Sequence, residues 1–142
     1  MKLLDVNLTL YAYVPETPQH ERARVWFEDL LSSREPVLIP LVTVLGFTRI
    51  STDIRVFREP FTLAYALDIV KSWLALPNVR IVEPSTDHWS TFRRVAIEGQ
   101  ARAGAITDAH IAALAIENGA ELCTTDRGFA RFNGLRTLDP LA

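Results

Sequence analysis

The chain has 142 residues, of which 49% are hydrophobic and 23% charged, and its formal net charge is −2. These values fit one globular domain spanning residues 1–142, which needs neither a disulfide nor a structural metal to fold. They argue against a protein that coats nucleic acid by charge alone, and no apolar run approaches the roughly 20 residues of a membrane span.

The only cysteine is Cys123, so no internal disulfide can form. A reducing, cytoplasmic setting fits a chain with one cysteine. The charges of Lys2 and Asp5 interrupt the first apolar run, and no signal peptide is predicted. We therefore expect a cytoplasmic protein without a membrane segment, and the sequence leaves secretion open.

Short apolar runs alternate along the chain with longer stretches of helical periodicity. The predicted strands cover residues 2–6, 37–39, 79–82, 120–124 and 135–138. The predicted helices cover residues 8–14, 18–31, 42–51 and 63–74, a stretch that begins at Ser85 or Thr86, a stretch from Thr107 to Gly119, and a short turn over 126–132. This alternation predicts an α/β fold, a three-layer sandwich with a central parallel sheet flanked by helices. The pattern does not give the strand order.

Two further expectations concern the start of the second helix and the buried face of the helix after residue 85. Thr17 and Pro18 are expected to start the second helix as its cap and first residue. In the helix after residue 85, Trp89, Phe92 and Ala96 form the predicted buried face.

Three aspartates fall where a ligand site is expected in a parallel sheet, near the carboxyl ends of strands. Asp5 is expected near the end of the first strand, Asp126 follows the fourth, and Asp108 opens a helix. Asp108 is also explained by the helix dipole and Asp126 by helix capping, but Asp5 in an apolar strand is costly to bury unpaired. Carboxylates that converge repel one another unless a cation lies among them, and hard oxygen ligands favour Mg²⁺ or Mn²⁺.

A carboxylate-held divalent ion suits phosphoryl chemistry, because it activates water and stabilises charge on the phosphate. No serine–histidine pattern competes with this interpretation. We expect His20 and His88 on solvated helix faces, and we expect His110 to point away from Asp108.

Several segments, taken together, resemble PIN-domain ribonucleases, and in particular the VapC toxins of bacterial VapBC toxin–antitoxin pairs. They are Leu3-Leu4-Asp5-Val6-Asn7, Gly46-Phe47-Thr48-Arg49-Ile50-Ser51-Thr52, Thr107-Asp108-Ala109-His110-Ile111-Ala112-Ala113-Leu114-Ala115, Leu122-Cys123-Thr124-Thr125-Asp126-Arg127-Gly128-Phe129, and the ending from Gly134-Leu135-Arg136 to Asp139-Pro140-Leu141. The resemblance covers nearly the whole chain in order and at suitable spacing.

This resemblance implies a PIN-like sandwich and a bacterial, Mg²⁺- or Mn²⁺-dependent endoribonuclease toxin. It implies an RNA substrate, with transfer RNA and ribosomal RNA both plausible, and products with 5′-phosphate and 3′-hydroxyl ends. The implied partner is a VapB-type antitoxin that occludes the acidic pocket, and the expected assembly is a homodimer or a hetero-oligomer with the antitoxin. Trp73, Phe57 and Phe61 are candidates for the antitoxin contact, although a core position is the better interpretation of Trp73.

Residue by residue, the resemblance assigns catalytic and metal-binding roles to Asp5, Asp108 and Asp126. Asn7 would orient Asp5, and Thr125, or its neighbour Thr124, would supply a hydroxyl beside Asp126.

The resemblance also offers arginines to hold the RNA backbone, namely Arg49, Arg93 and Arg127, each of which is equally explained as a surface residue. Two departures from the family pattern stand out. Gly46 occupies a position where many members have a glutamate, and Gly128 one where many have a second acid. A pocket with fewer carboxylates should bind metal more weakly, above all at a second metal position.

Three alternatives remain at this point. Asp5-Val6-Asn7-Leu8-Thr9 imitates the nucleophile motif of haloacid-dehalogenase-like phosphatases, but Asn7 replaces their second aspartate and no lysine follows Lys71. A receiver domain would also need a paired acid and a late lysine. A catalytically silent module that binds RNA or an antitoxin is the alternative that the missing carboxylates favour.

Overall fold

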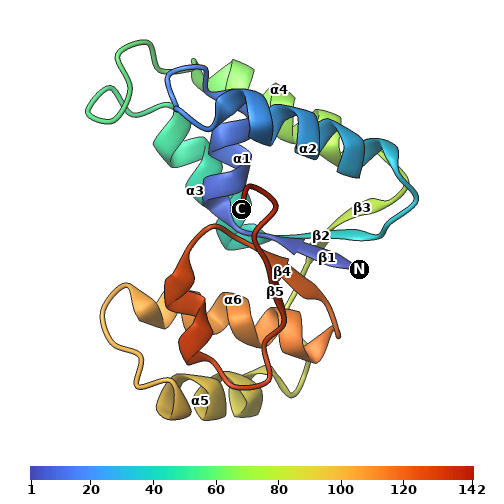
Figure 1. The fold of residues 1–142 in the computed structure, drawn as a ribbon, viewed down its shortest axis with the longest axis vertical. Coiled ribbons are helices and arrows are strands. Elements are labelled where there is room, and N and C mark those ends of the chain that lie inside the picture. Colours follow the sequence, from blue (N-terminus) through green and yellow to red (C-terminus); the bar gives the residue numbers. More distant parts are fainter.

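The computed structural model describes all residues, 1–142, and contains five strands, six α-helices and one short 3₁₀-helix (Figure 1). The strands are β1 (Lys2–Leu4), β2 (Val37–Pro40), β3 (Val79–Val82), β4 (Glu121–Cys123) and β5 (Thr137–Leu138). The helices are α1 (Val6–Tyr13), α2 (His20–Ser32), α3 (Leu41–Ser51), α4 (Leu63–Leu74), α5 (His88–Glu98), α6 (Ala105–Glu117) and the 3₁₀-helix η1 (Arg127–Arg131). None of the helices combines the length and apolar character that a membrane span requires.

All strand pairs are parallel, and the strand order is β3-β2-β1-β4-β5. Parallel neighbours need crossover connections, and the helices provide them. Figure 1 shows α1 to α4 on one face of the sheet and α5, α6 and η1 on the other. The predicted three-layer α/β sandwich with a central parallel sheet is therefore confirmed.

The core has two parts, one on each face of the sheet, because successive strand residues point to opposite faces. The larger part packs strand residues against α1 to α4, with Phe27, Phe47 and Trp73 as its largest members. The smaller part packs them against α5, α6 and η1. Leu4, Ile39 and Cys123 face the first part, and Leu3, Leu38 and Leu122 face the second. Trp73 is fully buried, which confirms its interpretation as a core residue.

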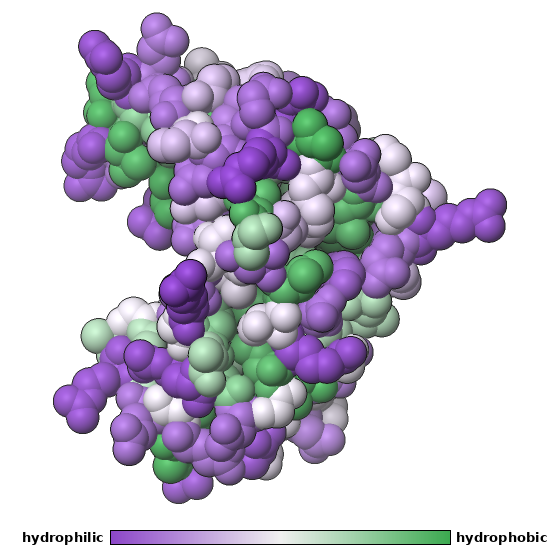
Figure 2. All heavy atoms as spheres, viewed as in Figure 1, coloured by the Kyte–Doolittle hydropathy of each residue, from purple (hydrophilic) through white to green (hydrophobic).

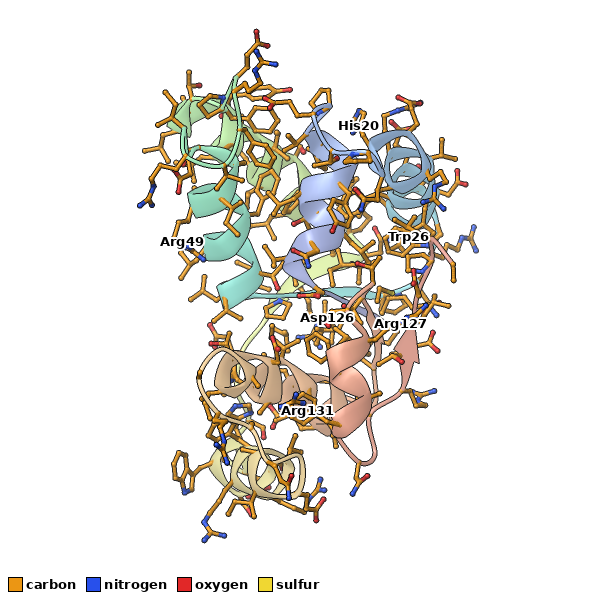
Figure 3. All side chains as sticks on the ribbon, turned by 60° about the vertical axis from the view of Figure 1, so that its left-hand side comes forward. His20, Trp26, Arg49, Asp126, Arg127 and Arg131 are labelled. Atoms are coloured by element: carbon orange, nitrogen blue, oxygen red, sulfur yellow. The ribbon has the colours of Figure 1, made fainter.

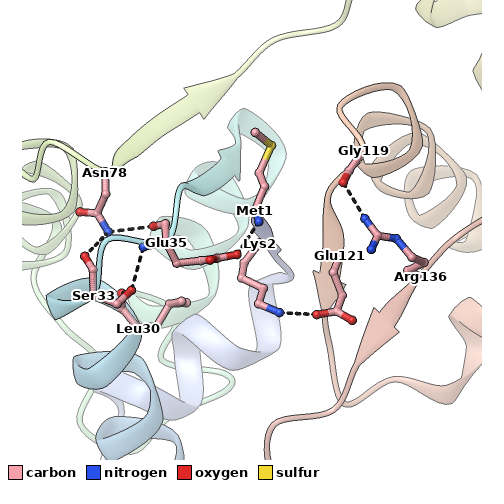
Figure 4. A network of polar contacts seen from close by, with 9 residues as sticks. All are labelled: Met1, Lys2, Leu30, Ser33, Glu35, Asn78, Gly119, Glu121 and Arg136. Atoms are coloured by element: carbon pink, nitrogen blue, oxygen red, sulfur yellow. Dashed lines mark hydrogen bonds and ion pairs between the residues drawn. The ribbon is translucent and has the colours of Figure 1, made fainter.

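Polar contacts hold the amino edge of the sheet, opposite the acidic residues (Figure 4). Lys2 pairs with Glu121 across β1 and β4, and the N-terminal amine pairs with Glu35. The side-chain amide of Asn78 donates to the Glu35 carbonyl at 3.0 Å, and Arg136 donates to the Gly119 carbonyl at 2.7 Å. These contacts join the amino ends of the strands to the segments that precede them.

Two helix starts differ from the prediction. The second helix begins at His20 and not at residue 18, because the Thr17 hydroxyl donates to the Val14 carbonyl at 2.8 Å and so does not cap a helix. The sixth helix begins at Ala105, two residues before Thr107. The predicted end of that helix is confirmed, since Gly119 has φ +64°, the left-handed conformation of a residue after a helix.

The α5 helix differs from the prediction in both its start and its buried face. It begins at His88, because Ser85 lies in a loop whose backbone N–H donates to Glu117 at 3.1 Å. Val95 is fully buried, and Trp89 is 71% exposed. The expectation that Trp89 belongs to the buried face is therefore wrong.

Candidate active site

The strand order places a crevice between β1 and β4. From β1 the chain adds β2 and then β3 on one side, and it returns to place β4 on the other side of β1. In open parallel sheets, ligands bind outside the carboxyl ends of the strands at such a reversal. Asp5 directly follows β1, and Thr124 directly follows β4.

Asp5 lies between β1 and α1, so the expectation that it belongs to a strand running to residue 6 is corrected. It is the N-cap of α1, with extended backbone (φ −82°, ψ 155°), and its Oδ1 accepts from the Val6 N–H at 2.8 Å. A capping carboxylate also meets the positive end of the α1 dipole. Asp5 is only 5% exposed. The N-cap hydrogen bond and the helix dipole therefore offset part of the free-energy cost of burying the Asp5 charge.

Thr124 holds the other oxygen of Asp5. Its Oγ1 donates to Asp5 Oδ2 at 2.7 Å and accepts from the Asp126 N–H at 3.0 Å. Asp126 in turn caps η1, since its Oδ1 accepts from the Gly128 N–H at 2.8 Å. A chain of hydrogen bonds thus links the end of β1, the end of β4 and the turn that carries Asp126.

Asp108 is half-buried in the first turn of α6, where the helix dipole favours a negative charge. Burial raises the pKa of its carboxyl, and the charges of Asp5 and Asp126 raise it further against the opposing effect of Arg131. Burial likewise raises the pKa of the Asp5 carboxyl, with a further contribution from Asp126. The charge of Asp126 thus acts on both Asp5 and Asp108.

Figure 2 shows a hollow at the left of the molecule, and comparison with Figure 1 places it between α3 above and η1 with the segment before α6 below. Figure 3, turned by 60°, places Asp126 between the two halves of the molecule, with Arg127 beside it and Arg131 further along η1. Asp126 therefore lies where the two helical layers meet at the carboxyl edge of the sheet.

No group of three or more His, Cys, Asp or Glu side chains is close enough together to enclose a metal ion by itself. Two glycines occupy positions where the family pattern often has acids, Gly46 against Val6 and Gly128 against Asp126. A Cβ on Gly46 would lie 3.0 Å from Val6 Cγ2, next to Asp5, and a Cβ on Gly128 would lie 3.0 Å from Asp126 Oδ1. The chain therefore packs closely at both positions and offers fewer carboxylates there.

The residues expected to support the aspartates were Asn7, for Asp5, and Thr125 or Thr124, beside Asp126; the structure selects Thr124. Of the two neighbouring threonines, Thr124 makes the contact with Asp5, and the hydroxyl of Thr125 makes no hydrogen bond to it. Asn7 lies in the first turn of α1 and also does not bond to Asp5, whose partners are the Val6 N–H and Thr124. Thr124 is the first residue after β4, and its side chain reaches Asp5 at the end of β1.

The predicted arginines lie in three different places. Arg127 follows Asp126 directly and is exposed on η1. Arg49 lies in the last turn of α3, where its charge helps to lower the pKa of Asp53. Arg93 is exposed on α5. The structure adds Arg131, which acts on Asp108 and which the sequence analysis did not single out. Arg131 lies in the short turn predicted over residues 126–132, and its closeness to Asp126 in sequence could have identified it as a candidate.

The histidines are more buried than expected. His20 Nδ1 lies 2.8 Å from the Tyr11 carbonyl, and His88 lies between α5 and α6, so neither occupies a solvated face. His88 Nε2 is 2.8 Å from His110 Nδ1, and His88 Nδ1 is 3.0 Å from Glu117 Oε2. His110 therefore belongs to a contact between α5 and α6 and not to the acidic site.

Known proteins are similar to this chain in sequence. Residues 2–135 match a family model described as PIN domain. The VapC ribonuclease Mb2897 of Mycobacterium bovis is 39% identical over 99% of this chain and 96% of its own length. Ribonuclease VapC33 of Mycobacterium tuberculosis is 34% identical over 99% of both chains.

Solved structures show the same fold. The Mycobacterium tuberculosis toxin VapC20, described as cleaving the sarcin–ricin loop, aligns with a TM-score of 0.69 at 15% identity, over 96% of this chain and 99% of that one. The VapBC2 complex from Rickettsia felis bound to a promoter DNA fragment aligns with a TM-score of 0.67 at 18% identity, over 96% of both chains.

Fold and site together define a small parallel α/β sandwich with aspartates gathered at the carboxyl edge of its sheet. The chain belongs to the PIN domain family, and its curated relatives named above are VapC ribonucleases.

Proposed function

We propose that this protein is a metal-dependent endoribonuclease, the toxin of a VapBC-type pair. The observation that carries the proposal is the buried Asp5 carboxylate, fixed by Thr124 next to Asp126 and sharing its electrostatic environment with Asp108. Burying and clustering carboxylates without a counter-ion is costly, so such a cluster favours a bound cation. The relatives at 33–39% identity, all named as ribonucleases, support the same activity.

The donor set fits Mg²⁺ or Mn²⁺. Asp5, Asp108 and Asp126 offer hard oxygen ligands, and each Asp5 oxygen already accepts one hydrogen bond that orients it. With few protein ligands, the ion would keep several waters, as Mg²⁺ commonly does. A bound ion of this kind lowers the pKa of water and stabilises charge on a phosphodiester under attack.

The residues of the chain would prepare this chemistry. Thr124 keeps Asp5 in one orientation, and the Gly128 N–H does the same for Asp126. Arg127 and Arg131 lie on η1 beside the aspartates, where guanidinium groups suit phosphate oxygens. These contacts would hold the RNA backbone with its scissile phosphate at the acidic edge.

The proposed partners follow from the relatives. Structural neighbours such as the VapBC2 complex contain both toxin and antitoxin, which supports a VapB-type antitoxin for this chain. The proposed substrate is a structured RNA cut at an unpaired loop, since sequence-selective proteins read unpaired bases most readily. We propose a cytoplasmic toxin that assembles as a homodimer or as a hetero-oligomer with its antitoxin.

The test is RNA cleavage by protein freed of antitoxin, with Mn²⁺ or Mg²⁺ and with chelator. We expect cleavage with either ion, none with chelator, and none for Asp5→Asn, which keeps the shape of the side chain. Cleavage by Asp5→Asn at the wild-type rate would refute the site. The second candidate function is a catalytically silent binding module, which is favoured by Gly46 and Gly128 at positions where relatives often have acids. No cleavage by the wild-type chain at any Mn²⁺ concentration would favour it.

A further inference from the structure

The most exposed aromatic side chain of the protein lies outside the acidic site. Trp89 is 71% exposed in the first turn of α5. It lines a groove of about 430 Å³ between α5 and the start of α6, together with Phe92, Arg93, Ile97, Gln100 and Ile106. Ile97 and Ile106 are also exposed, at 59% and 41%. A groove of this volume is in the range of sites for small organic ligands.

The chemistry of the groove fits a nucleobase. An exposed indole offers a stacking surface, and stacking on aromatic side chains is the main way proteins hold unpaired bases. Ile97 and Ile106 supply apolar walls, and Gln100 supplies an amide that can pair with a base edge.

The charges around the groove favour a nucleic acid over an apolar or cationic partner. Arg93 lines the groove and Arg102 lies in the turn between α5 and α6, and neither forms an ion pair. The neighbouring Arg94 is already paired with Glu98 at 3.3 Å. Arg93 lies in the groove with the exposed indole, and Arg102 directly follows Ala101, a lining residue at its other end. Two guanidinium groups without an ion-pair partner in this arrangement match the phosphates of one strand.

The helix turn that carries Trp89 is anchored to α6. The preceding residue, His88, contacts His110 and Glu117. The centroid of the Trp89 ring lies 5.7 Å from that of Phe92 on the same helix. Because the backbone at the start of α5 is anchored, little of its freedom is lost on binding.

The groove lies next to the acidic site. Ile106 and Asp108 are two residues apart in the first turn of α6, a rise of about 3 Å along the helix axis. Their side chains point to different sides of that turn, so a strand would pass over the start of α6 to reach both.

We propose that the groove formed by α5 and the start of α6 binds an unpaired base of the RNA next to the cleavage site, with the base stacked on Trp89 and the adjoining phosphates near Arg93 and Arg102. The proposal rests on the proposed ribonuclease function, which it deepens by adding a subsite for substrate recognition.

The test measures RNA binding separately from cleavage. Fluorescein-labelled single-stranded oligouridylate and oligoadenylate of about 10 nucleotides are titrated with Asp5→Asn protein in chelator, and anisotropy gives Kd. Adding Trp89→Ala should raise Kd about 5- to 150-fold, as loss of stacking on an aromatic ring does. Trp89→Phe should bind nearly as well as the parent. Tyr65→Ala, an exposed aromatic on α4, is the matched control and should change nothing.

The arginine contribution is measured by salt dependence. Arg93→Gln should reduce the slope of log Kd against log salt concentration by about 0.7, the value for one phosphate of a single strand. Arg80→Gln, an exposed arginine on β3, should leave the slope unchanged.

The inference would be overturned if Trp89→Ala bound RNA as tightly as Tyr65→Ala, or if none of these proteins bound RNA measurably. A Trp89→Ala protein that binds RNA normally but no longer binds its antitoxin would also overturn it, and would assign the groove to a protein partner. Cleavage by the wild-type chain with RNA binding independent of Trp89 would reject this subsite alone. Binding dependent on Trp89 without any cleavage would reject the nuclease proposal alone.

Discussion

Replacing Thr124 with valine removes the hydroxyl that joins the two strand ends of the site. The hydroxyl donates to Asp5 Oδ2 at 2.7 Å and accepts from the Asp126 N–H at 3.0 Å. A hydrogen bond to a charged group contributes about 1.5–3 kcal/mol to stability. Asp126 is exposed, so its N–H can bond to water instead and adds little.

We therefore expect Thr124→Val to lower the free energy of unfolding by about 2–3 kcal/mol, because valine has nearly the same shape but leaves a buried carboxylate oxygen without its partner. For a chain of this length the melting temperature should fall by roughly 5–10 °C. Urea unfolding followed by circular dichroism measures the change directly. Metal-dependent cleavage should also fall about 10- to 100-fold, the usual effect of losing a residue that orients a metal ligand.

Two variants make this test specific. Thr124→Ser keeps the hydroxyl and should restore most of the cleavage rate. Thr125→Val changes the half-exposed neighbour, which makes no hydrogen bond to Asp5, and should alter unfolding by less than about 0.5 kcal/mol. Equal effects of valine at the two positions would refute the role given to Thr124.

Three further predictions concern packing and burial. Gly99→Ala should destabilise the protein by about 1–3 kcal/mol, because a Cβ there would lie 2.7 Å from the Phe132 ring. Gly104→Ala is the control and should not destabilise it, since a Cβ there has nothing within 4 Å. Equal melting temperatures of the two variants would contradict this prediction. Glu117→Ala should lower the free energy of unfolding by about 1–3 kcal/mol, since it leaves its loop and histidine partners unpaired, and an unchanged urea midpoint would count against the contact. Burial raises the pKa of the Cys123 thiol to about 12, so iodoacetamide at pH 8 should label it only after unfolding, and rapid labelling of the native protein would show an accessible thiolate.

The fold could be predicted largely because local patterns determine it. Apolar runs such as 37–39 and 79–82 are too short for helices, and the stretches between them have helical periodicity. The strand order could not be predicted, because it depends on which side of β1 the chain returns to after β3. That choice is made by helix packing across the sheet and leaves no local signal.

The aspartates could be predicted because each follows a strand or opens a helix, and the strand ends of a parallel sheet meet at one edge. The choice between Thr125 and Thr124 as the supporting residue stayed open. Thr124 and Thr125 are alike in sequence, and only the exact end of β4 decides which side chain turns toward Asp5.

On the predicted buried face of α5, Phe92 and Ala96 pack against the core and Trp89 does not. The residues that face α6 or lie beside it are His88, Phe92, Val95 and Gly99, a helical series with spacings of four, three and four. Sequence reasoning prefers tryptophan to histidine in a core, and so selected Trp89. His88 instead faces α6, where it contacts His110 and Glu117, and the neighbouring Trp89 points to solvent.

The central claim is that Asp5, Asp108 and Asp126 bind one divalent cation together. Electron paramagnetic resonance of Mn²⁺ titrated into the protein, with free ion as the observed signal, measures this most directly. We predict one bound Mn²⁺ per chain, with affinity reduced at least about tenfold in both Asp5→Asn and Asp108→Asn. Wild-type affinity in these two variants, with both proteins folded, would contradict a shared metal site.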